Sequence, residues 1–244
     1  MSLPTTEKML TQVRKFVRRS TLIISAEEAE HVPGVPDAWV TVLRQQEQGI
    51  NGWAQLWQPY QTLLPGVYDF LQHQVRGVCL LREEQSLLSL LYVYSEGETD
   101  YFYRGYPALG SPPPEDSHNV WKHLPPRLQE FYLSLHDGWT ELSSDAMGPL
   151  PLADIELLSD QDWELEPGDE ARLPFRLDQV LTVFRNGGGD LLGLDFGSGA
   201  AEEHALAWWH EEPLKPDVDQ NFWALMDGWI RGQMEDVDRQ GDVV

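Results

Sequence analysis

The period of the hydrophobic pattern changes at Val75, and this change limits the chain to folds that combine helices with strands. Before Val75, apolar residues recur every three or four positions, which predicts helices over residues 36–48 and 53–73. Pro59 and Pro65 are expected to break the second of these helices into pieces, because proline removes a backbone donor and clashes with the preceding turn. Residues 36–73 are therefore predicted to be mainly helical.

Three short runs rich in β-branched and aromatic residues follow the change of period. They cover residues 75–81, 87–95 and 99–106 and are separated by polar turns. This arrangement predicts an antiparallel meander. The middle run is apolar on both faces, which indicates a central strand that is covered on both sides.

A proline-rich segment follows the predicted meander. Pro112, Pro113 and Pro114 can join neither a helix nor a strand ladder, and they favour an extended spacer. We therefore place a domain boundary there. The predicted division is an N-terminal α+β region (1–110), a proline-rich linker (111–118), a second domain (119–235) and an acidic tail (236–244).

The second half is predicted to begin with a helix. Pro125 and Pro126 suit its first turn, where the missing N–H does no harm. Its apolar stripe consists of Leu128, Phe131, Tyr132 and Leu135. Gly138 is expected to end this helix in the left-handed conformation.

Strands are predicted at residues 190–196 and 204–210, and a closing helix at residues 221–234. The predicted fold class is α+β. We expect a mixed or antiparallel sheet with helices packed on one face, preceded by a smaller α+β N-terminal region.

The formal net charge of −23 over 244 residues disfavours nucleic acid and anionic membranes as partners, because both would be repelled. It favours fast, salt-sensitive capture of a basic partner. Basic residues collect only at the start, where the first 20 residues contain Lys8, Arg14, Lys15, Arg18 and Arg19 but only one acid, Glu7. We predict a short basic amphipathic helix there, packed on the acidic body of the protein; a helix on a membrane surface is the alternative.

The sequence contains no secretory signal and no apolar run long enough for a membrane span. Cys79, the single cysteine, lies in an apolar run and is expected to be a buried thiol. These features favour a reducing, cytoplasmic location. They leave the oligomeric state open.

No motif for catalysis is present. The sequence lacks a serine nucleophile elbow, a Cys/His pair, a phosphate-binding loop and a dinucleotide fingerprint. His204 and His210 are six residues apart, which on a strand separates them by about 20 Å, too far for one metal ion. We therefore expect a protein that is not an enzyme and has no metal or cofactor. An unrecognised enzyme would need a deep pocket with a perturbed carboxylate or histidine.

Three segments of the second half resemble the SMI1/KNR4 group, the SUKH superfamily. They are a Leu-Pro start, a helix with Phe-Tyr and an Asp-Gly end at Leu124–Gly138, a Gly-Asp-x-Leu-x-Leu-Asp run at Gly189–Asp195, and an Asn-Phe-Trp helix at Asn221–Ile230. Together they cover roughly residues 115–235. The group usually has a double glycine after the first helix, whereas Trp139 follows Gly138 here.

This resemblance implies an α+β domain that binds proteins and has no catalytic residues. Many bacterial members are similar to immunity proteins that neutralise toxins, and fungal relatives regulate wall synthesis. The predicted function is therefore a non-enzymatic immunity protein that binds a cognate toxin with a basic site, such as a nuclease. The alternative is a scaffold or regulatory interaction protein without a toxin partner.

An acidic tract follows the first of these segments, and no Lys or Arg occurs between Arg127 and Arg172. The predicted partner-binding residues are Asp154, Glu156, Asp160, Asp162, Trp163, Glu164, Glu166 and Asp169. An exposed Trp163 ringed by carboxylates would serve as an anchor and a cation–π partner for Arg or Lys. A buried Trp163 would instead favour a solvated acidic loop without a binding role.

Overall fold

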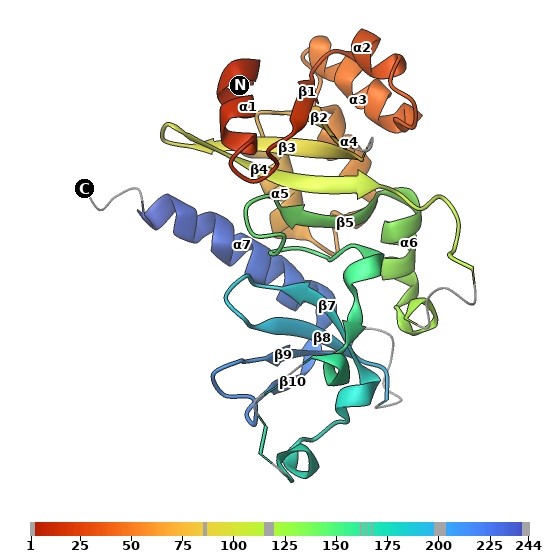
Figure 1. Cartoon of the computed structure of the whole chain (residues 1–244), viewed down its shortest axis with the longest axis vertical. Helices are drawn as coiled ribbons and strands as arrows, with labels where there is room; N and C mark the ends of the chain where they lie inside the picture. Colours follow the sequence, from red (N-terminus) through yellow and green to blue (C-terminus); the bar gives the residue numbers. More distant parts are fainter. Residues whose placement is uncertain are drawn as a thin grey trace.

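The computed structural model describes residues 3–84, 87–114, 120–161, 163, 165–166, 168–197 and 204–240, with the backbone alone for residues 233–240. These residues form helices and two antiparallel sheets of five strands each, so the predicted α+β class is confirmed. The two sheets follow one another along the long axis of the molecule (Figure 1).

The first sheet contains the predicted meander. Its strands, in spatial order, are β1 (Ser20–Ile23), β2 (Gly77–Glu83), β3 (Leu88–Glu96), β4 (Thr99–Pro107) and β5 (His136–Glu141). All neighbouring strands are antiparallel. β3 lies at the centre and its first seven residues are buried, which confirms the prediction of a central, covered strand.

Five helices supply the core on one face of the first sheet. They are α2 (Ala26–Glu30), α3 (Asp37–Glu47), α4 (Gly52–Trp57), α5 (Pro65–His73) and α6 (Pro126–Ser134). The predicted breaks are present, because a 3₁₀ turn (Gln58–Tyr60) follows α4 and Pro65 starts α5. The core beneath them is aromatic: the ring of Trp57 lies 4.7 Å from that of Trp139 and 5.7 Å from that of Phe131.

The opposite face of the first sheet is covered by α1 (Thr6–Val13). Met9 and Val13 pack there against Cys79. Lys8 Nζ lies 2.9 Å from the buried carboxylate of Asp100. The predicted N-terminal helix is therefore packed on the protein itself. Cys79 is fully buried, as predicted, and burial raises the pKa of its thiol to about 12.

The second sheet has the spatial order β10-β9-β8-β7-β6. Its strands are β6 (Glu156–Leu157), β7 (Val180–Arg185), β8 (Leu191–Asp195), β9 (His204–Trp208) and β10 (Asp217–Asn221). The closing helix α7 (Phe222–Gln240) contacts β8, β9, β10 and also α5. Its apolar residues Phe222, Met226 and Ile230 are buried in the same core as the helices on the first sheet. The α7 helix therefore joins the two sheets into one packed core.

The two sheets do not divide at the proline-rich segment. β5, which follows that segment, pairs with β4, which precedes it, so residues 136–141 complete the first sheet. Residues 115–118 of the predicted linker lie outside the described residues. The division of the chain into domains stays a prediction, whereas the change from one sheet to the other comes after Glu141.

Gly138 has the predicted positive φ, 83°, but it does not end a helix. α6 ends at Ser134, and Gly138 lies inside β5, next to the irregular register between β4 and β5. A Cβ atom at this position would lie 2.4 Å from the backbone nitrogen of Pro151. The prediction of a glycine helix stop is therefore wrong, because the close approach of another chain segment, and not a helix end, requires the glycine.

Candidate protein-binding surface

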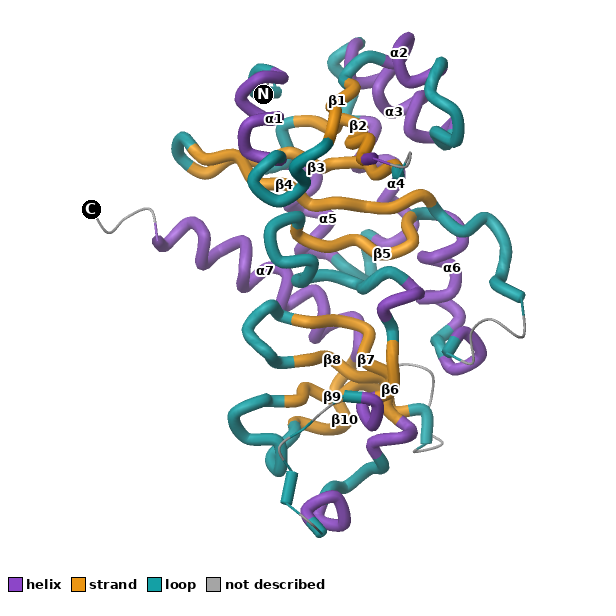
Figure 2. The backbone as a smooth tube through the Cα atoms, in the orientation of Figure 1, coloured by secondary structure: helices purple, strands orange, loops and turns teal. Residues whose placement is uncertain are grey.

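The segment between β5 and β7 carries the acidic tract and covers the face of the second sheet that α7 leaves open. Apart from the two-residue strand β6, it is loop with short 3₁₀ turns at Leu152–Asp154, Leu158–Asp160, Asp169–Arg172 and Leu177–Gln179 (Figure 2). Pro151 and Pro174 cannot donate to a ladder, so the chain forms no long strand here. Its buried anchors are Leu158 and Leu177, which pack with Trp208 of β9.

A cavity of about 880 Å³ opens within this segment. Its apolar lining is formed by Trp163, Leu165, Ala171, Phe175 and Leu177. Its polar lining is formed by Ser159, Gln161, Glu166, Glu170, Arg176 and Asp178, together with the backbone of Gly168. Cavities of this volume accommodate ligands or the anchoring side chains of a partner. We call it the acidic cavity.

Trp163 is half-buried in the wall of the acidic cavity. Its ring lies 5.1 Å from that of Trp208, and its indole N–H donates a 2.9 Å hydrogen bond to the carbonyl oxygen of Leu158. One edge therefore anchors the loop to the sheet while part of the ring remains accessible. The sequence left two alternatives for Trp163, an exposed anchor or a buried core residue. The half-buried side chain is intermediate between them.

Some carboxylates of the tract are neutralised by arginines. Glu156 accepts a 2.6 Å hydrogen bond from Arg185 of β7, and Asp169 accepts one of 2.8 Å from Arg172. Arg185 lies far from the tract in the sequence, so the absence of basic residues between positions 127 and 172 does not make the folded surface free of cations. These two acids are poorly available for a partner, because each already has a charge-assisted hydrogen bond.

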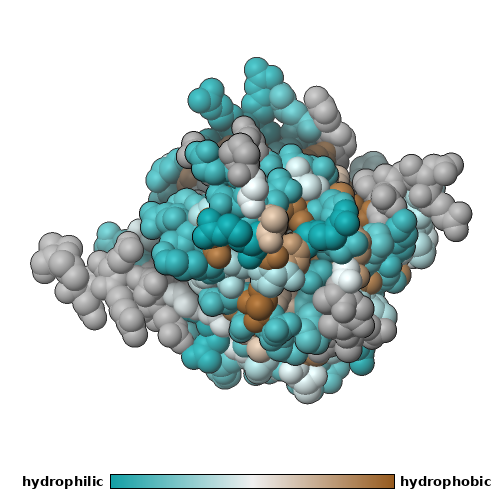
Figure 3. All heavy atoms as spheres, turned by 90° about the horizontal axis from the view of Figure 1, so that it is seen from below, coloured by the Kyte–Doolittle hydropathy of each residue, from teal (hydrophilic) through white to brown (hydrophobic). Residues whose placement is uncertain are grey.

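Other carboxylates have no cationic partner in the part of the chain that the structure describes. They are Asp154, Asp160, Glu166 and Glu170, and all four are exposed. Asp162 and Glu164 lie outside the described residues. Viewed from the end of the molecule where the second sheet lies, the surface is mostly hydrophilic with small hydrophobic areas (Figure 3). Glu166 and Glu170, two of these four acids, line the partly apolar cavity.

The sequence patterns did not identify several residues of this surface. Phe175 lies 6.0 Å from Trp208, ring to ring, and forms part of the cavity wall. Arg176 donates two hydrogen bonds to Asp178, which lower the pKa of that carboxyl group. Gln161 is fixed by a 2.9 Å hydrogen bond to Thr182. The available signal was the alternation of apolar and charged residues at 175–178, Phe-Arg-Leu-Asp.

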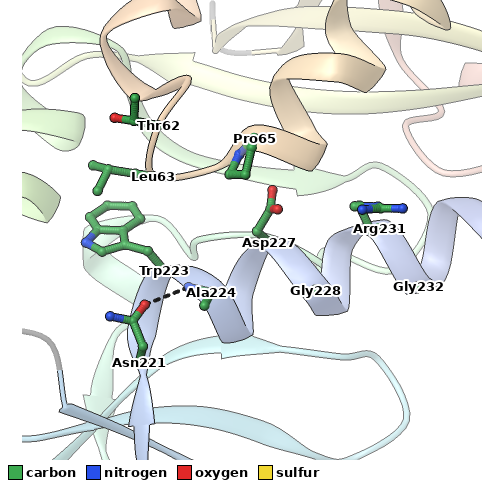
Figure 4. Close-up of a pocket in the computed structure, with 10 residues that line it drawn as sticks. All are labelled: Thr62, Leu63, Pro65, Asn221, Trp223, Ala224, Asp227, Gly228, Arg231 and Gly232. Carbon is green, nitrogen blue, oxygen red and sulfur yellow. Dashed lines mark hydrogen bonds between the residues drawn. The ribbon is translucent and has the colours of Figure 1, made fainter.

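A second cavity, of about 540 Å³, lies between α7 and the start of α5 (Figure 4). Its acidic residue, Asp227, accepts hydrogen bonds from the backbone N–H groups of Gly66 and Val67. Asn221 accepts one from the N–H of Ala224 at the start of α7. The Asp227 carboxylate thus joins the two helices and the Asn221 side chain caps the start of α7, and we assign the cavity no ligand.

The most strongly perturbed histidine, His136, has no exposed surface. Burial lowers its pKa to about 4. Its Nε2 atom lies 2.7 Å from the Tyr92 hydroxyl, and its Nδ1 atom lies 3.0 Å from the carbonyl oxygen of Tyr106. It therefore belongs to the core, where no substrate reaches it. No group of His, Cys, Asp or Glu within the described ranges is arranged to hold a metal ion.

Comparisons with protein-family models, with curated proteins and with solved structures find no match for this chain. The resemblance to the SMI1/KNR4 group therefore stays a prediction. None of the helices in the described part of the chain is long and apolar enough to cross a membrane.

Proposed function

We propose that this chain is a non-enzymatic binding protein that captures a basic protein through the acidic cavity. The observation that carries the proposal is that Glu166 and Glu170 line the cavity together with the half-buried Trp163 and have no cationic partner among the described residues. Asp160, between the lining residues Ser159 and Gln161, is a further exposed acid without a described cationic partner. A lysine or arginine side chain that enters the cavity gains the aromatic ring as a packing surface and the carboxylates as partners. The net charge of −23 speeds the encounter with a basic partner.

Within this proposal, the partner is a toxin with a basic active site and the chain acts as its immunity protein in the cytoplasm. The support is the SMI1/KNR4-like pattern of the second half together with the acidic surface. A toxin that acts on nucleic acid has a cationic groove, and the carboxylates of the cavity would occupy that groove in place of phosphates. The alternative is a scaffold protein that uses the same surface for a harmless basic partner.

The test is affinity purification from the native cell with three forms of the protein. The first is the wild type and the second is Asp160→Lys/Glu166→Lys/Glu170→Lys. The third, Glu27→Lys/Glu28→Lys/Glu98→Lys, changes the net charge equally at exposed positions on α2 and in the β3–β4 turn. We expect a basic protein to elute with the wild type and the control but not with the second form. Loss of three exposed ion pairs of about 0.5–1 kcal/mol each weakens binding roughly tenfold to hundredfold.

The two candidate functions are separated by expressing the captured protein alone. A toxin stops growth, and coexpression of the wild-type chain restores it while the cavity variant does not. A harmless partner would favour the scaffold function. Equal capture by the wild type and the folded cavity variant would exclude the acidic cavity as the binding surface.

A further inference from the structure

A third cavity, of about 590 Å³, lies beside the end of α1. The helix spans only Thr6–Val13, so it covers part of its sheet face and the chain then turns back through residues 14–19 to β1. The cavity is lined by Phe16, Val17, Arg18, Arg19, Glu83, Glu84, Arg104, Leu142, Ser143 and Asp145. We call it the N-terminal cavity. α1 and β1 lie at the opposite end of the molecule from β9 and β10 (Figure 1).

The acids of the N-terminal cavity are already paired. Glu84 accepts hydrogen bonds from Arg19, and Glu83 accepts one of 3.2 Å from Arg104. Asp145 forms an ion pair with the same Arg104. Arg104 is 7% exposed and its guanidinium also lies 4.7 Å from the centre of the Tyr106 ring. Because Glu83 and Asp145 share Arg104, the three acids and two arginines of these pairs together carry a charge of −1.

Arg18 of the lining and Lys15, which precedes the lining residue Phe16 in the sequence, are in the opposite situation. Lys15 and Arg18 are exposed and have no acidic partner within the described parts of the chain. Arg14 is exposed as well, and its guanidinium donates a hydrogen bond to the carbonyl oxygen of Ser20. On a chain with a net charge of −23, this is a local surplus of positive charge.

An apolar contact surface adjoins these cations. Phe16 is 49% exposed, although it lies between the buried Val13 and the partly buried Val17. Leu142 forms the facing part of the lining and is buried. An exposed aromatic ring flanked by unpaired cations matches a partner segment that carries both acidic and apolar side chains.

We propose that the N-terminal cavity binds an acidic segment of a second partner protein, with an apolar side chain of that segment placed against Phe16. Its carboxylates pair with Arg18 and Lys15, where charge-assisted hydrogen bonds to guanidinium are favourable. A short peptide confines its charge to this patch, whereas nucleic acid and anionic membranes extend over the acidic remainder of the chain and are repelled. This site goes beyond the proposed capture of a basic protein and uses the other end of the molecule.

The proposal is tested by selecting a randomised peptide-display library on the full-length wild-type protein. The selected peptides are then measured as labelled synthetic peptides against variants. We expect them to be rich in Asp and Glu around one apolar residue and to dissociate as salt is raised. The variant Lys15→Glu/Arg18→Glu should bind them about tenfold or more weakly, because both charged contacts become repulsive. Phe16→Ala should weaken peptide binding, but binding should depend on the salt concentration as it does for the wild type, because no charge is removed.

The control variant Lys122→Glu/Lys215→Glu changes the net charge equally at exposed positions elsewhere and should bind as the wild type does. Circular dichroism verifies that each variant is folded. Selection of peptides without acidic enrichment, or equal binding by Lys15→Glu/Arg18→Glu, overturns the proposal. The proposal is also overturned if acidic peptides do not bind but a single-stranded oligonucleotide or phosphatidylserine vesicles bind through Lys15 and Arg18. The variant Asp160→Lys/Glu166→Lys/Glu170→Lys should keep peptide binding, which separates this site from the acidic cavity.

Discussion

Asp227 of α7 accepts a 2.9 Å hydrogen bond from the backbone N–H of Val67, in the first turn of α5. Its second oxygen accepts one of 3.0 Å from Gly66. Leu64, the residue before α5, provides no side-chain cap of its own. A carboxylate 160 residues away in the sequence therefore supplies the missing cap, and its negative charge faces the positive end of the helix dipole. This contact ties the helix layer of the first sheet to the helix that packs on the second.

Asp227→Ala should lower the free energy of unfolding by about 2–3 kcal/mol, because one buried and one partly buried N–H group lose their acceptor. Asp227→Asn keeps one amide oxygen and should cost about 1 kcal/mol. Urea denaturation measures both changes as shifts of the midpoint. Glu98→Ala, an exposed acid in the β3–β4 turn, should stay within about 0.5 kcal/mol of the wild type. A similar small effect for Asp227→Ala would contradict a capping role.

Gly138→Ala should destabilise the protein by about 3 kcal/mol or more, because strained backbone and a direct clash add together. The φ angle is 83°, and the new Cβ atom would lie 2.4 Å from the Pro151 nitrogen. Gly49 is the matched control, since its φ is 76° but no atom lies within 4 Å of a Cβ built there. Gly49→Ala should cost only about 1 kcal/mol. Thermal or urea unfolding measures the stability of the two variants. Equal losses of stability would show that the structure relieves the clash with Pro151.

His136 should make the protein less stable as the pH falls from about 6.5 to about 4. The Tyr106 carbonyl oxygen accepts from Nδ1, so Nε2 is the unprotonated atom that accepts from Tyr92. Burial lowers the pKa of His136 to about 4 in the folded state, whereas an unfolded chain has the ordinary value of about 6.5. Between these values the unfolded chain binds a proton that the folded protein does not, so stability rises with pH across this window. The total effect is about 3 kcal/mol.

The measurement is the free energy of unfolding from pH 7 to pH 4, compared with that of His136→Gln. We expect His136→Gln to be less stable than the wild type at every pH in this range. Because it lacks the titrating imidazole, its stability should not show the decrease below pH 6.5 that His136 causes. NMR titration of the imidazole ring gives the pKa directly. Parallel stability curves for the two proteins would contradict the prediction.

Local patterns predicted most helices and strands because these depend on neighbouring residues. The apolar stripe of Leu128, Phe131 and Tyr132 became the buried face of α6, and the run at residues 87–95 became the covered strand β3. The short strand β1 was missed, since four residues carry too little period to recognise. β5 was missed because it contains His, Asp and Gly, and its burial comes from pairing with β4 across the proline-rich segment.

The candidate binding surface was predicted only in part. The sequence located an acidic tract with Trp163 inside it, and the structure places that residue in the wall of a cavity. Which acids remain unpaired did not follow from the sequence, since Arg185 reaches Glu156 from β7. Phe175 and Leu177 line the cavity because the chain packs back on the face of the second sheet at these residues. No short sequence motif predicts this packing.

The sequence by itself determined the α+β class, the extreme negative charge and the segregation of basic residues at the start of the chain, because composition and period are properties of the chain alone. Tertiary structure decided which strands pair, which carboxylates are neutralised and which glycine must remain a glycine. These outcomes depend on contacts between residues far apart in the sequence, such as Asp227 with Val67 and Gly138 with Pro151. A pattern read along the chain contains no distances between such residues, and the folded core sets them.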